Sequence, residues 1–194
     1  IQLGLHQASD KFTVPDHITT NGQTYSDATT HGDEHWTLAG ILEQSSNVGM
    51  IIAAEKMSNE QRYEFISKFG IGQDNGLGLP GEADGLLYSA DQWDLRTQNT
   101  VLFGQAYTTN ALQLTNAVAV IANKGVKKPQ RIIKAISDAE GHSEEQKPEG
   151  EATRVIDEQV ASQVMNAMES VSDHYSQFVK VDGYRVAAKS GTAE

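Results

Sequence analysis

Apolar and polar positions follow helical periods over much of this chain. Residues 1–36 are mixed and polar, and there we expect a short helix followed by loops. An apolar run follows Thr37, which stands where a helix N-cap is expected. Residues 47–54 are too apolar for a surface helix and indicate a buried one, whereas residues 60–69 show the pattern of an amphipathic helix that stops at Gly70.

Two further helices and a strand are predicted in the second half. Asn110 and Gln113 have the spacing of a capping box, and the helix that they open is apolar on most sides until Gly125. We therefore expect this helix to be central and buried. Asp157 begins another helix, which carries an apolar stripe. Apolar and polar residues alternate over 184–189, and this alternation predicts a strand.

These elements divide the chain into three parts without an internal repeat. Residues 1–135 should be mainly helical, residues 136–152 form an acidic, solvated loop, and residues 153–194 hold a helix and a strand. The expected fold class is α+β and predominantly helical. No linker is long enough to separate a second domain.

A glycine-rich segment runs from Gly70 to Gly81 and invites comparison with nucleotide-binding loops. Such loops need a strand before them and a helix after them. Here a helical pattern precedes the glycines, and Pro80-Gly81 follows them. We therefore interpret the segment as a series of tight turns.

Composition and charge exclude some functions. Apolar residues make up 38% of the 194 residues before glycine is counted, enough to bury a core. The formal net charge of −11 would repel phosphate backbones, so nucleic-acid binding is not expected. The absence of cysteine excludes structural disulfides and thiolate metal sites.

The histidines offer one weak metal-binding pattern. His31 and His35 have i, i+4 spacing, with two acidic residues between them. Gly32 would break the helix that such a pair needs, so we expect a solvated loop and no metal. No apolar run reaches the length of about 18 residues that a membrane span needs. Both ends look cut from a longer chain, so we expect a fragment.

Two short motifs stand out as candidate chemistry. Ser45-Ser46-Asn47 lies in the break between two apolar helices, and Lys189-Ser190-Gly191-Thr192 lies at the end of the predicted strand. Either motif alone is weak, because each is common by chance. Between them, in this order, stand Leu79-Pro80-Gly81-Glu82, Phe103-Gly104-Gln105 and Ala122-Asn123-Lys124-Gly125. Together they resemble class B penicillin-binding proteins, and most closely the cell-division branch of that family.

The resemblance implies acyl transfer through a serine ester, with the serine in an S-x-x-K motif. This sequence contains no S-x-x-K; Ser176 and Lys180 are one residue too far apart. We therefore expect the nucleophile to lie outside this chain. The chain alone should be inactive, although its parent protein would be an enzyme.

The two motifs that are present receive roles from the same resemblance. Ser45 would relay a proton between the lysine of the nucleophile motif and the leaving or entering amine, and Asn47 would bond an amide of the substrate. Lys189 would hold the Ser45 hydroxyl in a polarised network and supply positive charge for the substrate carboxylate.

The end of the predicted strand adds a substrate site. Ser190 and Thr192 are two residues apart, so on a strand both hydroxyls point to one face and can bind one carboxylate. Gly191 between them lets a peptide approach the strand edge. The resemblance also implies that the Thr192 backbone N–H is one of two oxyanion-hole donors. No cofactor is expected.

The resemblance further implies a fold and partners. The family has a five-stranded antiparallel sheet with helices on both faces and an all-helical lobe, and only the strand that carries Lys189 would fall in this chain. The apolar face normally covered by the sheet would be exposed, so we expect self-association. Expected ligands are peptidoglycan stem peptides and β-lactams. The parent would be anchored by a single span on the outer face of the bacterial membrane, in contact with division proteins.

Two other functions remain open from the sequence. A D,D-carboxypeptidase, which passes the acyl group to water, would use the same residues. A non-catalytic interaction module of the division machinery follows directly from the missing serine.

Overall fold

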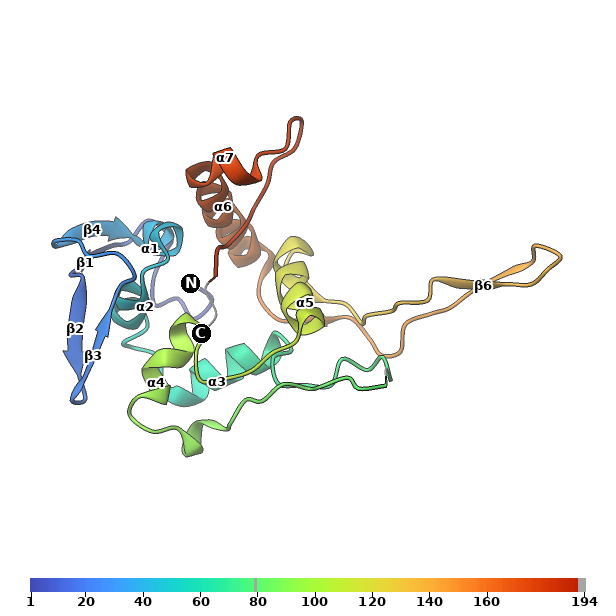
Figure 1. The fold of residues 1–194 in the computed structure, drawn as a ribbon, viewed down its shortest axis with the longest axis horizontal. Helices are drawn as coiled ribbons and strands as arrows, with labels where there is room; N and C mark the ends of the chain where they lie inside the picture. Colours follow the sequence, from blue (N-terminus) through green and yellow to red (C-terminus); the bar gives the residue numbers. More distant parts are fainter. Residues whose placement is uncertain (79, 192–194) are drawn as a thin grey trace.

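The first 37 residues form two small antiparallel sheets in the computed structural model, which describes residues 1–78 and 80–191 (Figure 1). Strand β1 (Lys11–Val14) pairs with β4 (Glu34–Thr37), and β2 (His17–Thr20) pairs with β3 (Gln23–Ser26). The prediction of a short helix within residues 1–36 is therefore wrong.

The turn sequence explains why β2 and β3 form a hairpin, although the residues around it are mostly polar. Its two-residue loop is Asn21-Gly22, and both residues have positive φ, 53° and 72°. This pair is the preferred sequence of a hairpin turn whose twist matches that of the strands. The Asn-Gly signal outweighs the low apolar content of the flanking residues.

Three helices follow the sheets, and the cap of the first matches the sequence expectation. Helix α1 (Leu38–Gln44) begins after Thr37, whose side chain accepts a hydrogen bond from the Gly40 N–H. Helix α2 (Asn47–Ala53) is buried as predicted, and α3 (Asn59–Lys68) ends before Gly70. The side chains at the centre of the core come from β1, α1 and α2: Val14, Ile41, Val48 and Ala53.

The central part of the chain is irregular before it forms a longer helix. The described residues between 70 and 89 hold no helix or strand, apart from an isolated β-bridge between Leu86 and Thr108, as expected for the glycine-rich segment. The short turns η1 (Ala90–Gln92), α4 (Thr97–Thr100) and η2 (Val101–Phe103) lead to α5 (Ala111–Ala122).

Helix α5 confirms its predicted cap but not its predicted burial. The side chains of Asn110 and Gln113 form the reciprocal capping box. Leu114 and Val118, one turn apart, are nevertheless 56% and 44% exposed. The expectation of a central buried helix is wrong here, because only one side of α5 is covered within the described residues.

An arm extends from the body over the acidic segment (Figure 1). Strand β5 (Val126–Lys127) pairs with β8 (Thr153–Arg154) at its base, and β6 (Ala135–Ser137) pairs with β7 (Ser143–Glu145) further out. The segment predicted as a loop over 136–152 therefore contains part of a hairpin. Its solvent exposure is as expected, since nearly every residue in it is exposed.

The C-terminal part returns to the body and lies beside α6 (Figure 1). Helix α6 (Glu158–His174) contacts α1 and α5, and the short α7 (Ser176–Val179) follows it. The strand predicted over 184–189 is not formed. Among the described residues this segment has no strand partner; the Ala188 N–H donates instead to the Met168 carbonyl at 3.2 Å.

The predicted α+β class is confirmed, with more residues in helices than in strands. Residues 1–78 and 80–191 hold no helix that is both long and apolar enough to cross a bilayer. The same residues contain no group of three or more His, Asp or Glu side chains arranged to bind a metal ion.

Candidate active site

The break between α1 and α2 presents two serines in opposite directions. Ser45 ends α1 in the left-handed conformation, with φ 56°, which costs a non-glycine residue roughly 1–2 kcal/mol. Its side chain is exposed, whereas Ser46 is buried and caps α2 by accepting a hydrogen bond from the Gly49 N–H at 2.8 Å. The break thus places one hydroxyl at the surface and uses the other to begin the next helix.

Close packing between the two helices depends on Gly49. A Cβ atom at this position would lie 2.8 Å from both Cγ atoms of Ile41 and 2.9 Å from the Ser46 Oγ. Real Cβ atoms do not approach other atoms so closely. The glycine therefore lets α2 pack directly against α1 and fixes the position of the break.

Lys189 reaches this break from the other end of the chain. Its Nζ donates to the Ser45 Oγ at 2.7 Å, across 144 residues of sequence. The same Nζ lies 2.9 Å from the Ser190 carbonyl oxygen and 3.4 Å from the Ser190 Oγ. The structure thus brings together three of the residues that the sequence singled out.

The electrostatics of Lys189 follow from this position. The side chain as a whole is exposed, but its ammonium end is held against three oxygen atoms of the protein. Burial of that end lowers the pKa of Lys189 below its ordinary value. No carboxylate is paired with this ammonium group among the described residues, so its charge is available to a ligand.

The remaining predicted site residues are placed less fully. Asn47 begins α2, and its Nδ2 donates to the Ser26 carbonyl at 3.1 Å. Gly191 is exposed, and a Cβ atom there would meet nothing within 4 Å. Thr192 lies outside the described residues.

Asp27 is a residue of this region that sequence reasoning missed. Its Oδ2 accepts from the Ser46 Oγ at 2.6 Å, and its Oδ1 accepts from the Val48 N–H at 3.0 Å. The side chain is only 6% exposed. No pattern in the sequence links it to a serine 19 residues away, because the two meet only once the hairpin packs on α2.

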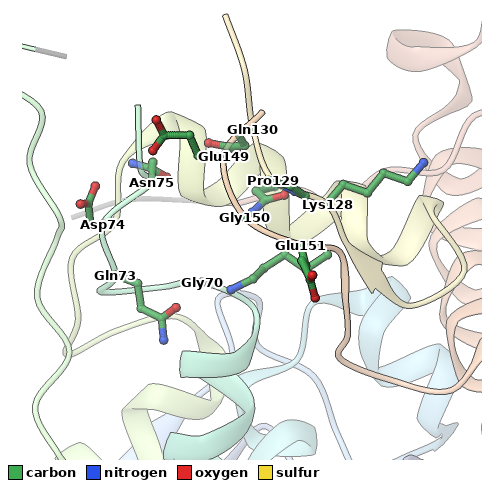
Figure 2. Close-up of a pocket in the computed structure, with 12 residues that line it drawn as sticks. Gly70, Gln73, Asp74, Asn75, Lys128, Pro129, Gln130, Glu149, Gly150 and Glu151 are labelled. Carbon is green, nitrogen blue, oxygen red and sulfur yellow. The ribbon is translucent and has the colours of Figure 1, made fainter. Parts of the chain in front are cut away.

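A separate cavity of about 170 Å³ lies away from these residues, at the base of the arm (Figure 2). Its lining comes from the glycine-rich segment, α5 and the two sides of the arm, including Asp74, Lys128 and Glu149. None of the predicted site residues lines it. The cavity is therefore separate from the candidate active site, where Ser45 and Lys189 meet at the α1–α2 break.

Comparison with known families supplies the identity. The family model described as the penicillin-binding protein transpeptidase domain matches residues 1–194, the whole chain.

The chain belongs to the transpeptidase family of class B penicillin-binding proteins.

Curated relatives support this assignment at sequence level. The chain is 36% identical to penicillin-binding protein PbpB of Mycolicibacterium smegmatis, with 100% of this chain and 31% of the relative covered. It is 33% identical to the peptidoglycan D,D-transpeptidase FtsI of Escherichia coli, with 94% of this chain and 29% of the relative covered. The chain thus spans about a third of the length of these relatives.

Solved structures support the assignment at the level of fold. A peptidoglycan synthetase from Bifidobacterium adolescentis shares 69% identity with a TM-score of 0.93, over 100% of this chain and 36% of that one. Penicillin-binding protein 3 from Mycobacterium tuberculosis, solved with aztreonam, shares 34% identity with a TM-score of 0.82, over 96% of this chain and 40% of that one. The fold of this chain is therefore that of the matching part of a penicillin-binding transpeptidase domain.

Proposed function

We propose that the protein containing this chain is a peptidoglycan D,D-transpeptidase that works by a serine ester and is acylated by β-lactams. The observation that carries the proposal is the 2.7 Å bond from Lys189 Nζ to Ser45 Oγ, in a chain of the penicillin-binding transpeptidase family. Two motifs that are 144 residues apart share one site, as acyl transfer by this family requires.

The hydrogen-bond direction supports a proton relay through Ser45. A hydroxyl has one proton to donate and two lone pairs that accept. Because the Lys189 ammonium group donates to the Ser45 Oγ, the hydroxyl proton of Ser45 must point elsewhere. Ser45 can therefore give that proton to an amine, and the lowered pKa of Lys189 favours proton exchange between the two groups.

The reaction has two balanced steps. The nucleophile serine would give its proton to the lysine of its own motif as its oxygen attacks the carbonyl carbon of the penultimate D-Ala. The bond to the terminal D-Ala nitrogen would break, and that amine would leave with this proton, delivered from the lysine through Ser45. An amine from a second strand would then attack the ester, and the serine oxygen would recover a proton by the same route.

The segment after Lys189 would hold the donor peptide. The Ser190 hydroxyl and the Lys189 ammonium group lie next to each other at the surface end of this segment, so they suit the substrate carboxylate. Gly191 leaves open space for a peptide backbone. Asn47 would bond a substrate amide, Thr192 would add a second hydroxyl, and its N–H would be one oxyanion donor.

The nucleophile itself would come from outside these 194 residues. No S-x-x-K occurs in the sequence, and Ser45 is already assigned as a proton relay. The isolated chain would then bind ligands weakly and form no acyl-enzyme. The parent would work on the outer face of the bacterial membrane, held by a single span and in contact with division proteins.

Labelling with a fluorescent penicillin tests the proposal. The parent protein should form a covalent adduct at a serine outside this chain, located by mass spectrometry of peptides. The isolated 194-residue chain, added at the same concentration, should remain unlabelled. An unlabelled parent would contradict the proposed function, and an adduct within the chain would show that its nucleophile lies there.

The missing S-x-x-K also favours a second candidate, a non-catalytic interaction module. An unlabelled parent that still binds division proteins would support this candidate. A D,D-carboxypeptidase would be labelled like a transpeptidase. Incubation of the parent with a stem peptide and an acceptor amine separates the two, because a transpeptidase gives a cross-linked dimer and a carboxypeptidase gives free D-Ala alone.

A further inference from the structure

The side chain of His31 lies between two groups that can only accept hydrogen bonds. Its Nδ1 is 2.7 Å from the Gly32 carbonyl oxygen, and its Nε2 is 3.0 Å from Asp27 Oδ2. A neutral imidazole has one N–H and can satisfy only one of these acceptors, whereas an imidazolium satisfies both. The geometry therefore fits a charged His31 paired with a charged Asp27.

This arrangement is not a catalytic triad, although it contains a serine, a histidine and an aspartate. In a triad the histidine stands between the other two and takes the serine proton. Here Asp27 stands in the middle, since its Oδ2 accepts from both the Ser46 Oγ and the His31 Nε2. Ser46 is also buried, so no substrate reaches it.

Both oxygens of Asp27 instead bind the start of α2. Oδ2 accepts from the Ser46 side chain, and Oδ1 accepts from the Val48 N–H, one of the free donors at the helix N-terminus. A carboxylate at this position is favoured by the helix dipole as well. Asp27 thus holds Ser46 and Val48, the residues on either side of Asn47. Ser46 is also the residue that directly follows Ser45.

We propose that Asp27, held in place by a charged His31, is a positioning residue that sets the geometry of Ser45 and Asn47 for acyl transfer. The inference rests on the proposed function, because it concerns the efficiency of the same reaction. It extends that function by adding two residues from the turn after β3 which do not touch the substrate.

The surroundings of His31 decide how the pair responds to pH. The carboxylates of Asp27 and Asp16 lie near the ring, and Asp16 is itself paired with His17. Trp36 of β4 packs against the ring in a tilted arrangement, with a centroid distance of 5.0 Å and an interplanar angle of 55°. The bond to the Gly32 carbonyl, then the bond to Asp27, raise the pKa of His31 above its ordinary value. The stabilisation of the folded state by the bonds of charged His31 is therefore complete below the pKa that His31 has in the unfolded chain. It is lost as the pH rises through the raised pKa of His31 in the folded state.

Substitution of Asp27 in the parent protein gives the first test. Asp27→Asn keeps the shape of the side chain but replaces one acceptor oxygen by an NH₂ group. The single remaining oxygen cannot accept from Ser46 and Val48 in both of their present positions. We expect the rate constant of acylation by a fluorescent penicillin to fall by up to about 100-fold, the loss expected when a catalytic group is misplaced by about 1 Å. Asp33→Asn, an exposed aspartate on the same loop, is the matched control and should react like wild type.

The second test uses pH and does not depend on a folding defect. His31→Gln keeps an N–H donor but cannot titrate, and the side chain that it replaces is only 14% exposed. The ratio of the wild-type to the variant acylation rate should be highest near pH 6 and fall as His31 deprotonates. Taking the ratio cancels the titration of Lys189, which both proteins share.

The outcomes separate this inference from the proposed function. If wild-type parent is not acylated, the proposed function fails. If wild type is acylated and Asp27→Asn, folded by circular dichroism, reacts at the wild-type rate, only the positioning role fails. A wild-type to His31→Gln ratio that does not change between pH 6 and 9 would overturn the role of the charged His31.

Discussion

The two halves of the candidate site are built in different ways. The Ser45–Asn47 half is held by a buried cap, by a buried carboxylate and by glycine-dependent packing on Ile41. The Lys189 half is an exposed segment without a strand partner among the described residues, attached to α6 by the Ala188 bond and by the ion pair of Arg185 with Glu169.

The difference shows which half is organised by this chain alone. At the helix break the hydrogen bonds and the core packing are all internal, so the geometry of Ser45 is largely fixed. The Lys189 segment has the sequence pattern of a strand, but no strand within residues 1–78 and 80–191 pairs with its backbone. We infer that its position depends on the rest of the transpeptidase domain.

Removal of the Lys189 amine should have the largest effect, since it breaks the contact between the halves. In the parent protein, Lys189→Ala should lower the acylation rate constant about 10²- to 10⁴-fold, the range for loss of an acid–base partner. Stopped-flow measurement with a fluorescent penicillin would give the rate. Lys180→Ala, which removes an exposed lysine from the same region, should react normally; equal losses in both variants would contradict a specific role for Lys189.

Crowding of the helix break should have the next largest effect, and it tests the internal rigidity of that half. Gly49→Ala places a Cβ atom against Ile41 and Ser46, so we expect the free energy of unfolding to fall by about 1–3 kcal/mol, as in other overpacked cores. Urea unfolding monitored by circular dichroism measures this change. Gly32→Ala adds the same methyl group in open space and should leave stability nearly unchanged.

The same contrast explains what the sequence could predict. Helix starts were predicted well at Thr37, Asn110 and Asp157, because the cap residue and the apolar period are local signals. The meeting of Ser45 with Lys189 was expected only through the family resemblance, since no local pattern joins positions 144 residues apart.

The failures share a physical origin as well. The strand expected over 184–189 and the burial expected for α5 both assume neighbours that the described residues do not supply. A period of two specifies which side chains share a face, but a strand also needs a partner backbone. Asp27 was missed for a related reason, because its partners become adjacent only in the tertiary structure.

The smallest effect is expected where the Lys189 segment contacts α6. It measures how much these contacts contribute to the position of the Lys189 half. Arg185→Ala removes an exposed ion pair with Glu169, in which the Nη2–Oε2 distance is 2.6 Å. Exposed pairs contribute about 0–1 kcal/mol, so the unfolding free energy should change by no more than that. In the parent the acylation rate should stay within about threefold of wild type, because neighbouring strands would hold the segment. A loss as large as that of Lys189→Ala would instead mean that Arg185 anchors the segment, and that both halves of the site are organised within this chain.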